Sequence, residues 1–282
     1  MRTFGFLLRR SVAAAFDDGC FTIAKGAAYS ALLSFFPVLA SSAAILVQTR
    51  AAFVSRALQN TLSEIVPPGS EGLVVEQFRA AGSRPYALLI VADLIALWAA
   101  SGAIDSLIDG FHAAYHVPRS RSSARQSAVS MGLVLLCAVP LLGASMLILF
   151  GEQVEGAMLH WSGGQPWHWV GHVARYAAAI GATVPVAGCL LYFGPYRRQR
   201  WRYVWPGAVL ATIAWLLATA GFGWYVRHIG NYNVMYGSVG AGIALLVWMY
   251  LMAVIALIGC EFNAEYERAM ASAAAHPNVL PK

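Results

Sequence analysis

The amino-acid sequence predicts an all-α, polytopic integral membrane protein with six transmembrane helices and both termini in the cytoplasm. Composition gives the first reason: 59% of the 282 residues are hydrophobic and 11% are charged, whereas about a quarter of a typical soluble chain is charged. The second reason is that the apolar residues gather into six runs, each long enough to cross a hydrocarbon core of roughly 30 Å as a helix. The third is the sorting of basic residues between the loops.

The predicted spans follow one another as a single membrane domain, 1–282. Five of the six runs hold a stretch of spanning length without Asp, Glu, Lys, Arg or His, whereas the second run contains two aspartates. Backbone groups in hydrocarbon must be satisfied within their own segment, and the period-two alternation of a barrel is absent, so each span is expected to be a helix. The predicted spans are residues 27–47, 86–107, 128–150, 176–196, 203–226 and 237–262.

The segment before the first span, residues 1–26, is predicted to be cytoplasmic. No cleavable signal peptide is expected, because the first apolar run continues at full spanning length. Several apolar residues of this segment fall near one side of a helix: Phe4, Leu7, Leu8, Val12 and Phe16. The pattern favours an amphipathic helix lying on the membrane surface, and a disordered tail is the alternative.

The basic residues set the orientation and the expected partners. Most of the 19 lysines and arginines fall before the first span, in the second and fourth connections and in the tail at 263–282. These segments share one side of a six-span arrangement, which the positive-inside rule places in the cytoplasm. The net charge of +6 then reflects insertion and contact with anionic lipid headgroups. Membrane lipids are therefore the expected partners, and nucleic acid is not.

The longest predicted outer segment is residues 48–85. Apolar residues recur in it at helical spacing on both sides of a Pro-Pro-Gly break, which predicts two short amphipathic helices. These helices could cover an opening on the outer surface. They could equally be interfacial helices that only shield the loop.

Ionisable residues within the spans are candidates for a substrate path, because their insertion costs about 2.5 to 3.5 kcal/mol each. Asp93 lies inside the second span, and Arg175 at the outer start of the fourth span is long enough to reach toward it. Glu261 lies at the inner end of the sixth span. Asp93 and Arg175 could form a charged element of a transport path, or a buried structural pair, and a protonated Asp93 is a further alternative.

A second polar group lies at the cytoplasmic end of the second helix. Its spacing of i, i+4, i+7 and i+11 forms a single helical stripe: Asp105, Asp109, His112 and His116. Such a stripe could bind a metal or relay protons, but a solvated face that pairs with nearby arginines explains it equally well. We expect neither a resident metal nor a cofactor.

Small residues suggest where two helices approach each other closely. The sixth span begins with two small-xxx-small pairs, and the first span offers a matching face. We therefore expect the first and sixth helices to pack through these faces, although the same faces could serve contacts between copies in a homo-oligomer. The residues concerned are Ser30, Ser34, Gly237, Ser238, Ala241 and Gly242.

Four blocks of sequence carry a resemblance to a known family. In chain order, the chain is similar to the YihY/virulence factor BrkB family of bacterial inner-membrane proteins over most of its length. The last block is the most specific, whereas residues 150–200 match mainly in hydropathy. The blocks are "AAYSALLSFFPVLA" (27–40), "LWAASGAIDSLIDGFHAAYHVPRSR" (97–121), "WPGAVLATIAWLLATAGFGWYV" (205–226) and "NYNVMYGSVGAGIALLVWMYLMAVIALIGCEFNAEYE" (231–267).

The resemblance implies a six-helix, multi-pass protein of the bacterial cytoplasmic (inner) membrane. The family is linked to serum resistance, and transport of substrates or lipids has been suggested for it. It also carries an older label, ribonuclease BN, a tRNA-processing enzyme. Because the sequence lacks the clustered His and Asp motif of a metal-dependent nuclease, ribonuclease activity is not expected. Where the family tends to read "ALN" after the second span, this chain reads "GFH" (110–112), so a polar role there is in doubt.

The polar stretch before the sixth span completes the predicted substrate path. Asn231, Asn233 and Tyr236 supply hydrogen-bonding groups in a short outer turn. The turn could help to gate an outward-facing cavity, or be an interfacial turn with aromatic anchors. The leading functional prediction is a transporter or lipid flippase-like carrier. The alternative is a scaffold that recruits envelope partners. Enzyme activity is not expected, because spacing places no nucleophile beside a base.

Overall fold

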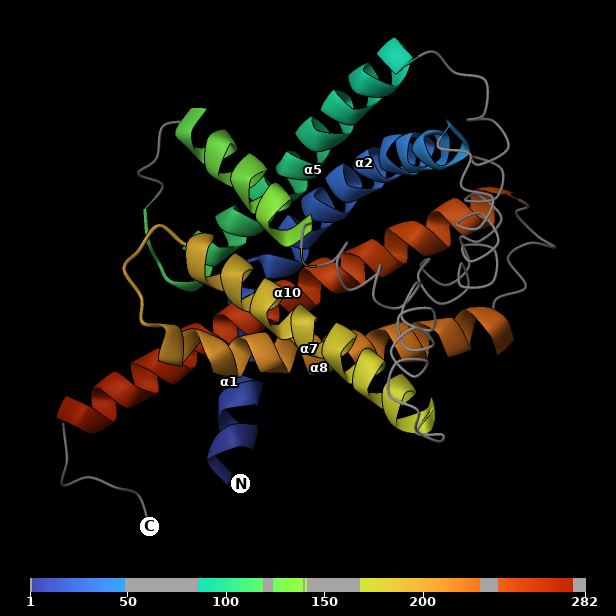
Figure 1. The fold of residues 1–282 in the computed structure, drawn as a ribbon. Helices are drawn as coiled ribbons and strands as arrows, with labels where there is room; N and C mark the ends of the chain where they lie inside the picture. The colour runs from blue at the N-terminus through green and yellow to red at the C-terminus, as the bar shows by residue number, and fades with distance from the viewer. Residues whose placement is uncertain are drawn as a thin grey trace, which may run out of the picture.

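The computed structural model describes residues 2–48, 86–118, 124–138, 140, 168–228 and 238–275. All regular secondary structure in these ranges is α-helical, as predicted (Figure 1). The outer segment at 48–85, apart from its first residue, and the turn that carries Asn231, Asn233 and Tyr236 lie outside the described residues. The helices are α1 (Arg2–Asp17), α2 (Cys20–Gln48), α5 (Tyr86–Ala114), the helix Ala124–Ala138, α7 (His168–Phe193), α8 (Trp201–His228) and α10 (Ser238–Ala275).

Four of the described helices contain segments long and apolar enough to cross a membrane: Cys20–Val38, Leu94–Ala114, Trp201–Val226 and Val239–Ser272. Two shorter apolar helical segments, Ala124–Ala138 and Gly181–Phe193, overlap the third and fourth predicted spans. The chain is therefore a multi-pass membrane protein. The count of six spans and the orientation of the termini stay predictions.

The surface of these helices fits a lipid environment. Large apolar side chains are exposed along the outer faces of α5 and α8, with Trp98 at 71% and Leu217 at 70% exposure. Exposing so much apolar area to water costs roughly 25 cal/mol per Å², and hydrocarbon removes this cost. The buried core lies toward one end of the bundle, where Ile108, Phe111 and Leu257 are almost completely covered.

Helix α10 is the centre of that core. Figure 1 shows α10 passing between α2 and α8, and it also contacts α1 and α5. Its 38 residues extend about 57 Å at 1.5 Å per residue, which is nearly twice the thickness of a hydrocarbon core. The predicted sixth span ends at residue 262, but the helix continues to Ala275. The extra turns are stabilised by the other helices that pack around them.

The backbones of α8 and α10 come close together where the two helices cross. A Cβ atom added to Gly207 would lie 2.2 Å from the backbone oxygen of Gly259, so only glycine fits there. Asn263 holds the same crossing: its Oδ1 accepts the Gly207 N–H at 2.7 Å, and its Nδ2 donates to the Val204 oxygen at 3.0 Å.

The predicted contact between the first and sixth helices has a more varied outcome. α2 and α10 do contact each other, but Ser30 lies against α5, where its Oγ is 3.3 Å from an ideal Cβ on Gly102. A Cβ at Gly242 would meet nothing within 4 Å among the described residues. Gly237 lies outside these residues, and the structure describes only the backbone of Ser238. Packing through the four small residues of the sixth span stays a prediction.

Candidate functional site

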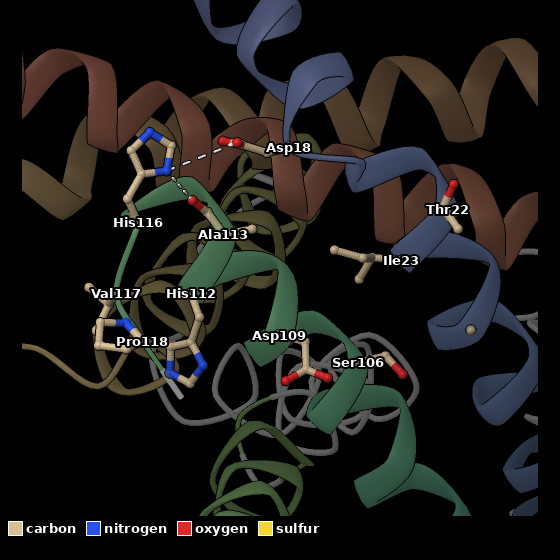
Figure 2. A pocket seen from close by; sticks show the side chains of 11 residues that line it. Asp18, Thr22, Ile23, Ser106, Asp109, His112, Ala113, His116, Val117 and Pro118 are labelled. Atoms are coloured by element: carbon tan, nitrogen blue, oxygen red, sulfur yellow. Dashed lines mark hydrogen bonds and ion pairs between the residues drawn. The ribbon is translucent and has the colours of Figure 1, made fainter. Parts of the chain in front are cut away.

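A cleft of about 690 Å³ opens at the end of the bundle near the core. It lies between the turn that joins α1 to α2, the first turns of α2 and the last turns of α5 (Figure 2). Its walls carry several polar and ionisable side chains. The lining residues are Asp18, Thr22, Ile23, Gly26, Ser106, Asp109, His112, Ala113, His116, Val117 and Pro118.

Two helix ends shape the cleft. α1 ends at a left-handed glycine, Gly19 (φ 68°), whose N–H donates to the Phe16 oxygen at 3.2 Å; this turn presents Asp18. α5 ends in a Schellman-type arrangement, in which the Val117 N–H donates to the His112 oxygen at 2.9 Å and His116 has φ 52°. The left-handed backbone at His116 directs its imidazole ring toward the turn between α1 and α2.

His116 and Asp18 face each other across the mouth of the cleft. His116 Nδ1 lies 4.0 Å from Asp18 Oδ1 and 2.8 Å from the Ala113 oxygen, as the dashed lines in Figure 2 show. The two side chains differ in exposure, at 66% for His116 and 19% for Asp18. The two groups form an ion pair only when the imidazole carries a positive charge.

Glu261, on α10, is fully buried. The Cys20 thiol, on the first residue of α2, donates to Glu261 Oε1 at 3.6 Å. Asp18 lines the cleft two residues before Cys20. The turn between α1 and α2 therefore borders the cleft on one side and leads into the core on the other.

Ion pairs fasten the surrounding elements to α10. The almost fully buried Glu265 accepts from Arg10 of α1 and from Arg268, both at 2.5 Å. Arg268 also donates to the Ala114 oxygen at the end of α5, at 2.6 Å. Glu267 pairs with Arg197, in the connection between α7 and α8, at 2.6 Å. One helix thereby holds α1, the end of α5 and the connection between α7 and α8.

Tyr115 lies within this network, just after α5. The Arg197 guanidinium sits 4.5 Å from the centre of its ring. Burial raises the pKa of the Tyr115 hydroxyl above its usual range, and the nearby Arg197 offsets this only in part. Tyr115 is therefore neutral throughout the physiological pH range and acts here as a packing surface for the guanidinium.

The four residues of the predicted polar stripe contact different parts of the structure. Asp105 accepts a short hydrogen bond from Ser130 of the helix Ala124–Ala138, and His112 Nε2 accepts the Tyr196 N–H at 3.3 Å. Because α5 ends at Ala114, His116 leaves the helical stripe and faces Asp18. Asp109 stays in the cleft wall. Within the described ranges, no group of three or more His, Cys, Asp or Glu residues is placed to hold a metal ion.

The predicted substrate path stays a prediction. Of its residues, the structure describes the side chain of Glu261, which is buried on α10. Asp93 lies in α5 and Arg175 in α7, but the structure describes only their backbones, so their pairing stays a prediction. Sequence reasoning missed Asp18 and Cys20. The available signal was the Asp-Asp-Gly turn between an amphipathic helix and the first apolar run, which places an acid at the membrane surface.

Comparison with known proteins shows which family and which relatives this sequence resembles. A sequence model of the family described as Virulence factor BrkB matches residues 12–280. The ribonuclease-like protein YfkH of Bacillus subtilis is 29% identical over 242 residues, which cover 84% of this chain and 86% of that protein. No solved structure matches.

Two further relatives are each named UPF0761 membrane protein. The one from Tolumonas auensis is 30% identical over 156 residues, covering 53% of this chain and 49% of the relative. The one from Alkalilimnicola ehrlichii is 28% identical over 267 residues, covering 87% of this chain and 55% of the relative. The matched region thus spans about half the length of these two relatives.

Proposed function

Because the chain belongs to the virulence factor BrkB family and folds as a bundle of membrane helices, we propose that it is a flippase-like carrier of the bacterial cytoplasmic membrane. Its substrate is an amphipathic, lipid-like molecule with a cationic or hydrogen-bond-donating head group. The observation that carries this proposal is the cleft between α2 and α5, which presents two carboxyl groups and two imidazoles at the end of a membrane bundle. Its transport serves the integrity of the cell envelope.

The dimensions and chemistry of the cleft support a binding role. Its volume of about 690 Å³ falls in the range of roughly 300–1,000 Å³ that is typical of small-molecule sites. Asp18 and Asp109 are acceptors suited to an amine or hydroxyl group. Polar and ionisable residues among membrane helices commonly mark a substrate pathway.

The neighbouring surface supports an amphipathic substrate. The two helices that form the cleft also expose large apolar side chains further along, including Leu33 of α2 and Leu94 of α5. A lipid can therefore place its head group in the cleft while its chains stay beside these apolar faces. In this proposal Glu261 is the inner polar element of the path, and Asp93, Arg175 and the turn with Asn231, Asn233 and Tyr236 form its outer part.

Reconstitution into liposomes tests the proposal. Fluorescent lipids with amine or anionic head groups are placed in both leaflets, and their exchange is followed by chemical quenching of the outer leaflet. The full chain should speed exchange of the amine lipid relative to protein-free vesicles. Asp109→Asn should slow it by about tenfold, the factor for ~1.4 kcal/mol, whereas Asp17→Asn, an exposed acid outside the cleft, should not. Equal exchange with and without the protein would refute carriage of these lipids.

Two other functions, a scaffold and a ribonuclease, would give different results in related experiments. A scaffold that recruits envelope partners would leave lipid exchange unchanged, and its cellular phenotype would depend on the segment at 48–85 rather than on Asp109. The name of YfkH refers to that Bacillus protein, and for this chain we propose no ribonuclease activity. Precursor tRNA incubated with the purified chain should remain intact, and cleavage that co-purifies with the protein would contradict this.

A further inference from the structure

We propose that the connection between α7 and α8 binds one anionic phospholipid of the bilayer. The phosphate group lies on Arg198 and Arg200, and an acyl chain lies along the outer face of α8. Figure 1 shows this connection at the end of the bundle where α5 and α10 also end. The site is separate from the cleft, and it does not depend on the proposed carrier activity.

The connection is held firmly by its neighbours. Gln199 is buried, and its Nε2 donates to the backbone oxygens of Leu191 at 2.7 Å and Tyr192 at 2.8 Å. These bonds tie the connection back to the last turns of α7. Arg197 is fixed from the other side, because its Nη2 donates to Glu267 of α10 at 2.6 Å. The residues on both sides of position 198 are therefore anchored.

Between and beyond these anchors, the connection presents cations to its surroundings. Arg198 and Arg200 are exposed, and neither guanidinium has an ion pair or hydrogen bond with any residue that the structure describes. Arg202, on the first turn of α8, is also exposed. A guanidinium is a planar fork of donors that matches phosphate oxygens. Because the backbone is already held, little freedom is lost when a phosphate binds.

Aromatic rings beside the arginines indicate how deep the connection lies. Trp201 is stacked on Tyr192, with ring centroids 4.3 Å apart and an angle of 10° between the planes. Trp205 lies one turn further along α8, with its ring centroid 6.2 Å from that of Trp201. Both tryptophans stay exposed. Exposed tryptophans are typical of the boundary between hydrocarbon and water, which is where lipid head groups lie.

An apolar ridge continues from these rings along α8. Trp205, Val209, Ile213 and Leu217 follow one another at a spacing of four residues, which forms one ridge on a helix surface. Their exposed fractions range from 41% at Val209 to 70% at Leu217. The ridge extends about 18 Å at 1.5 Å per residue, slightly more than half of a hydrocarbon core of roughly 30 Å. One acyl chain can therefore lie along it within a single leaflet.

The combination of charge and ridge selects the occupant. A free phosphate or a nucleic acid could contact the arginines, but it would leave the ridge unused. A zwitterionic lipid carries a positive group of its own, which weakens its attraction to a cluster of cations. An anionic phospholipid such as phosphatidylglycerol satisfies both parts of the surface, because basic clusters at the membrane surface attract anionic head groups.

Native mass spectrometry of the delipidated full chain in nonionic detergent tests the site. Titrated phosphatidylglycerol should bind more tightly than phosphatidylcholine with the same acyl chains. Arg198→Gln combined with Arg200→Gln should weaken the tightest phosphatidylglycerol site by about thirtyfold, the factor for ~2 kcal/mol, at roughly 1 kcal/mol for each arginine near an anionic surface. Arg9→Gln combined with Lys25→Gln removes two exposed cations from α1 and α2, and this control should bind as the unsubstituted chain does.

The outcomes separate a discrete lipid site from general attraction. A selective loss in the Arg198 and Arg200 variant supports the site, whether or not vesicles exchange lipid. Equal losses in the two double variants would show that charge acts diffusely, and equal binding of both lipids would remove the preference for an anionic head group. Either result overturns the proposal. Excess glycerol phosphate or a short single-stranded RNA should not displace the lipid; displacement would assign the arginines to a soluble anion or to nucleic acid instead.

Discussion

Replacement of Gly207 by alanine should loosen the crossing of α8 and α10. The new Cβ would lie 2.2 Å from the Gly259 oxygen and 2.5 Å from both Cγ and Oδ1 of Asn263. A backbone oxygen cannot rotate away as a side chain can, so the two helices must separate. Overpacking of this kind costs about 1–3 kcal/mol, and the two hydrogen bonds of Asn263 at the crossing are worth roughly 1 kcal/mol each. The expected loss of unfolding free energy is therefore about 3–5 kcal/mol.

The same structure provides graded controls for this prediction. At Gly259 the added Cβ would lie 2.9 Å from Ala211 Cβ and 3.1 Å from the Gly207 oxygen, which is a milder clash. At Gly221, also on α8, it would meet nothing within 4 Å among the described residues. Gly221→Ala should therefore be neutral or stabilise the helix by up to about 1 kcal/mol, the difference in helix propensity.

Thermal melting of the detergent-solubilised chain, followed by circular dichroism, measures the series. At roughly 2–4 °C per kcal/mol, Gly207→Ala should melt at least ~6 °C below the unsubstituted chain, Gly259→Ala should fall between, and Gly221→Ala should match or exceed it. The reasoning fails if Gly207→Ala melts with Gly221→Ala, because the backbone contact would then not set the separation of the helices.

Three further predictions follow from other contacts. Cysteines placed at Ser30 and Gly102 should form a disulfide under mild oxidation, since the Cβ separation of 3.6 Å suits one; peptide mass spectrometry detects it, and a failure would contradict the contact of α2 with α5. Asn263→Ala should lower the unfolding free energy by about 2 kcal/mol, measured by chemical denaturation, and a neutral result would mean that water replaces both bonds. A double-mutant cycle of Arg10→Ala and Glu265→Gln should give a coupling of about 1 kcal/mol or less that weakens with salt, because Arg10 is exposed; a zero coupling at low salt would show that α1 is held by packing alone.

Long apolar runs could be located from the sequence because a helix that crosses hydrocarbon must be apolar along most of its length. The predicted runs at 27–47 and 203–226 fall inside α2 and α8. The helix ends were less predictable, since α5 continues to Ala114 and α10 to Ala275. Past the predicted spans these turns are held by contacts between distant segments, and apolar periodicity carries no information about those contacts.

The candidate site shows the same limit. Helical spacing placed Asp105, Asp109 and His112 on one side of α5, but it extended the stripe one turn too far. A left-handed residue before Val117 and Pro118 ended the helix, and the proline was the only local sign of it. The contact of Cys20 with Glu261 joins residues 241 positions apart. No pattern within a single segment can predict such a pairing.

The central position of α10 has a consequence for biosynthesis. Residues 238–275 leave the ribosome after every helix that they contact, so the earlier helices must wait in the bilayer with Asp18, Cys20 and the α8 glycine uncovered. Folding of the core is thus delayed until translation has passed residue 275. A ribosome stalled before residue 238 would hold a chain in which α2 can pack on α5 and α7 on α8, but which lacks the helix that joins them. Quality-control proteases would then meet its uncovered polar groups first.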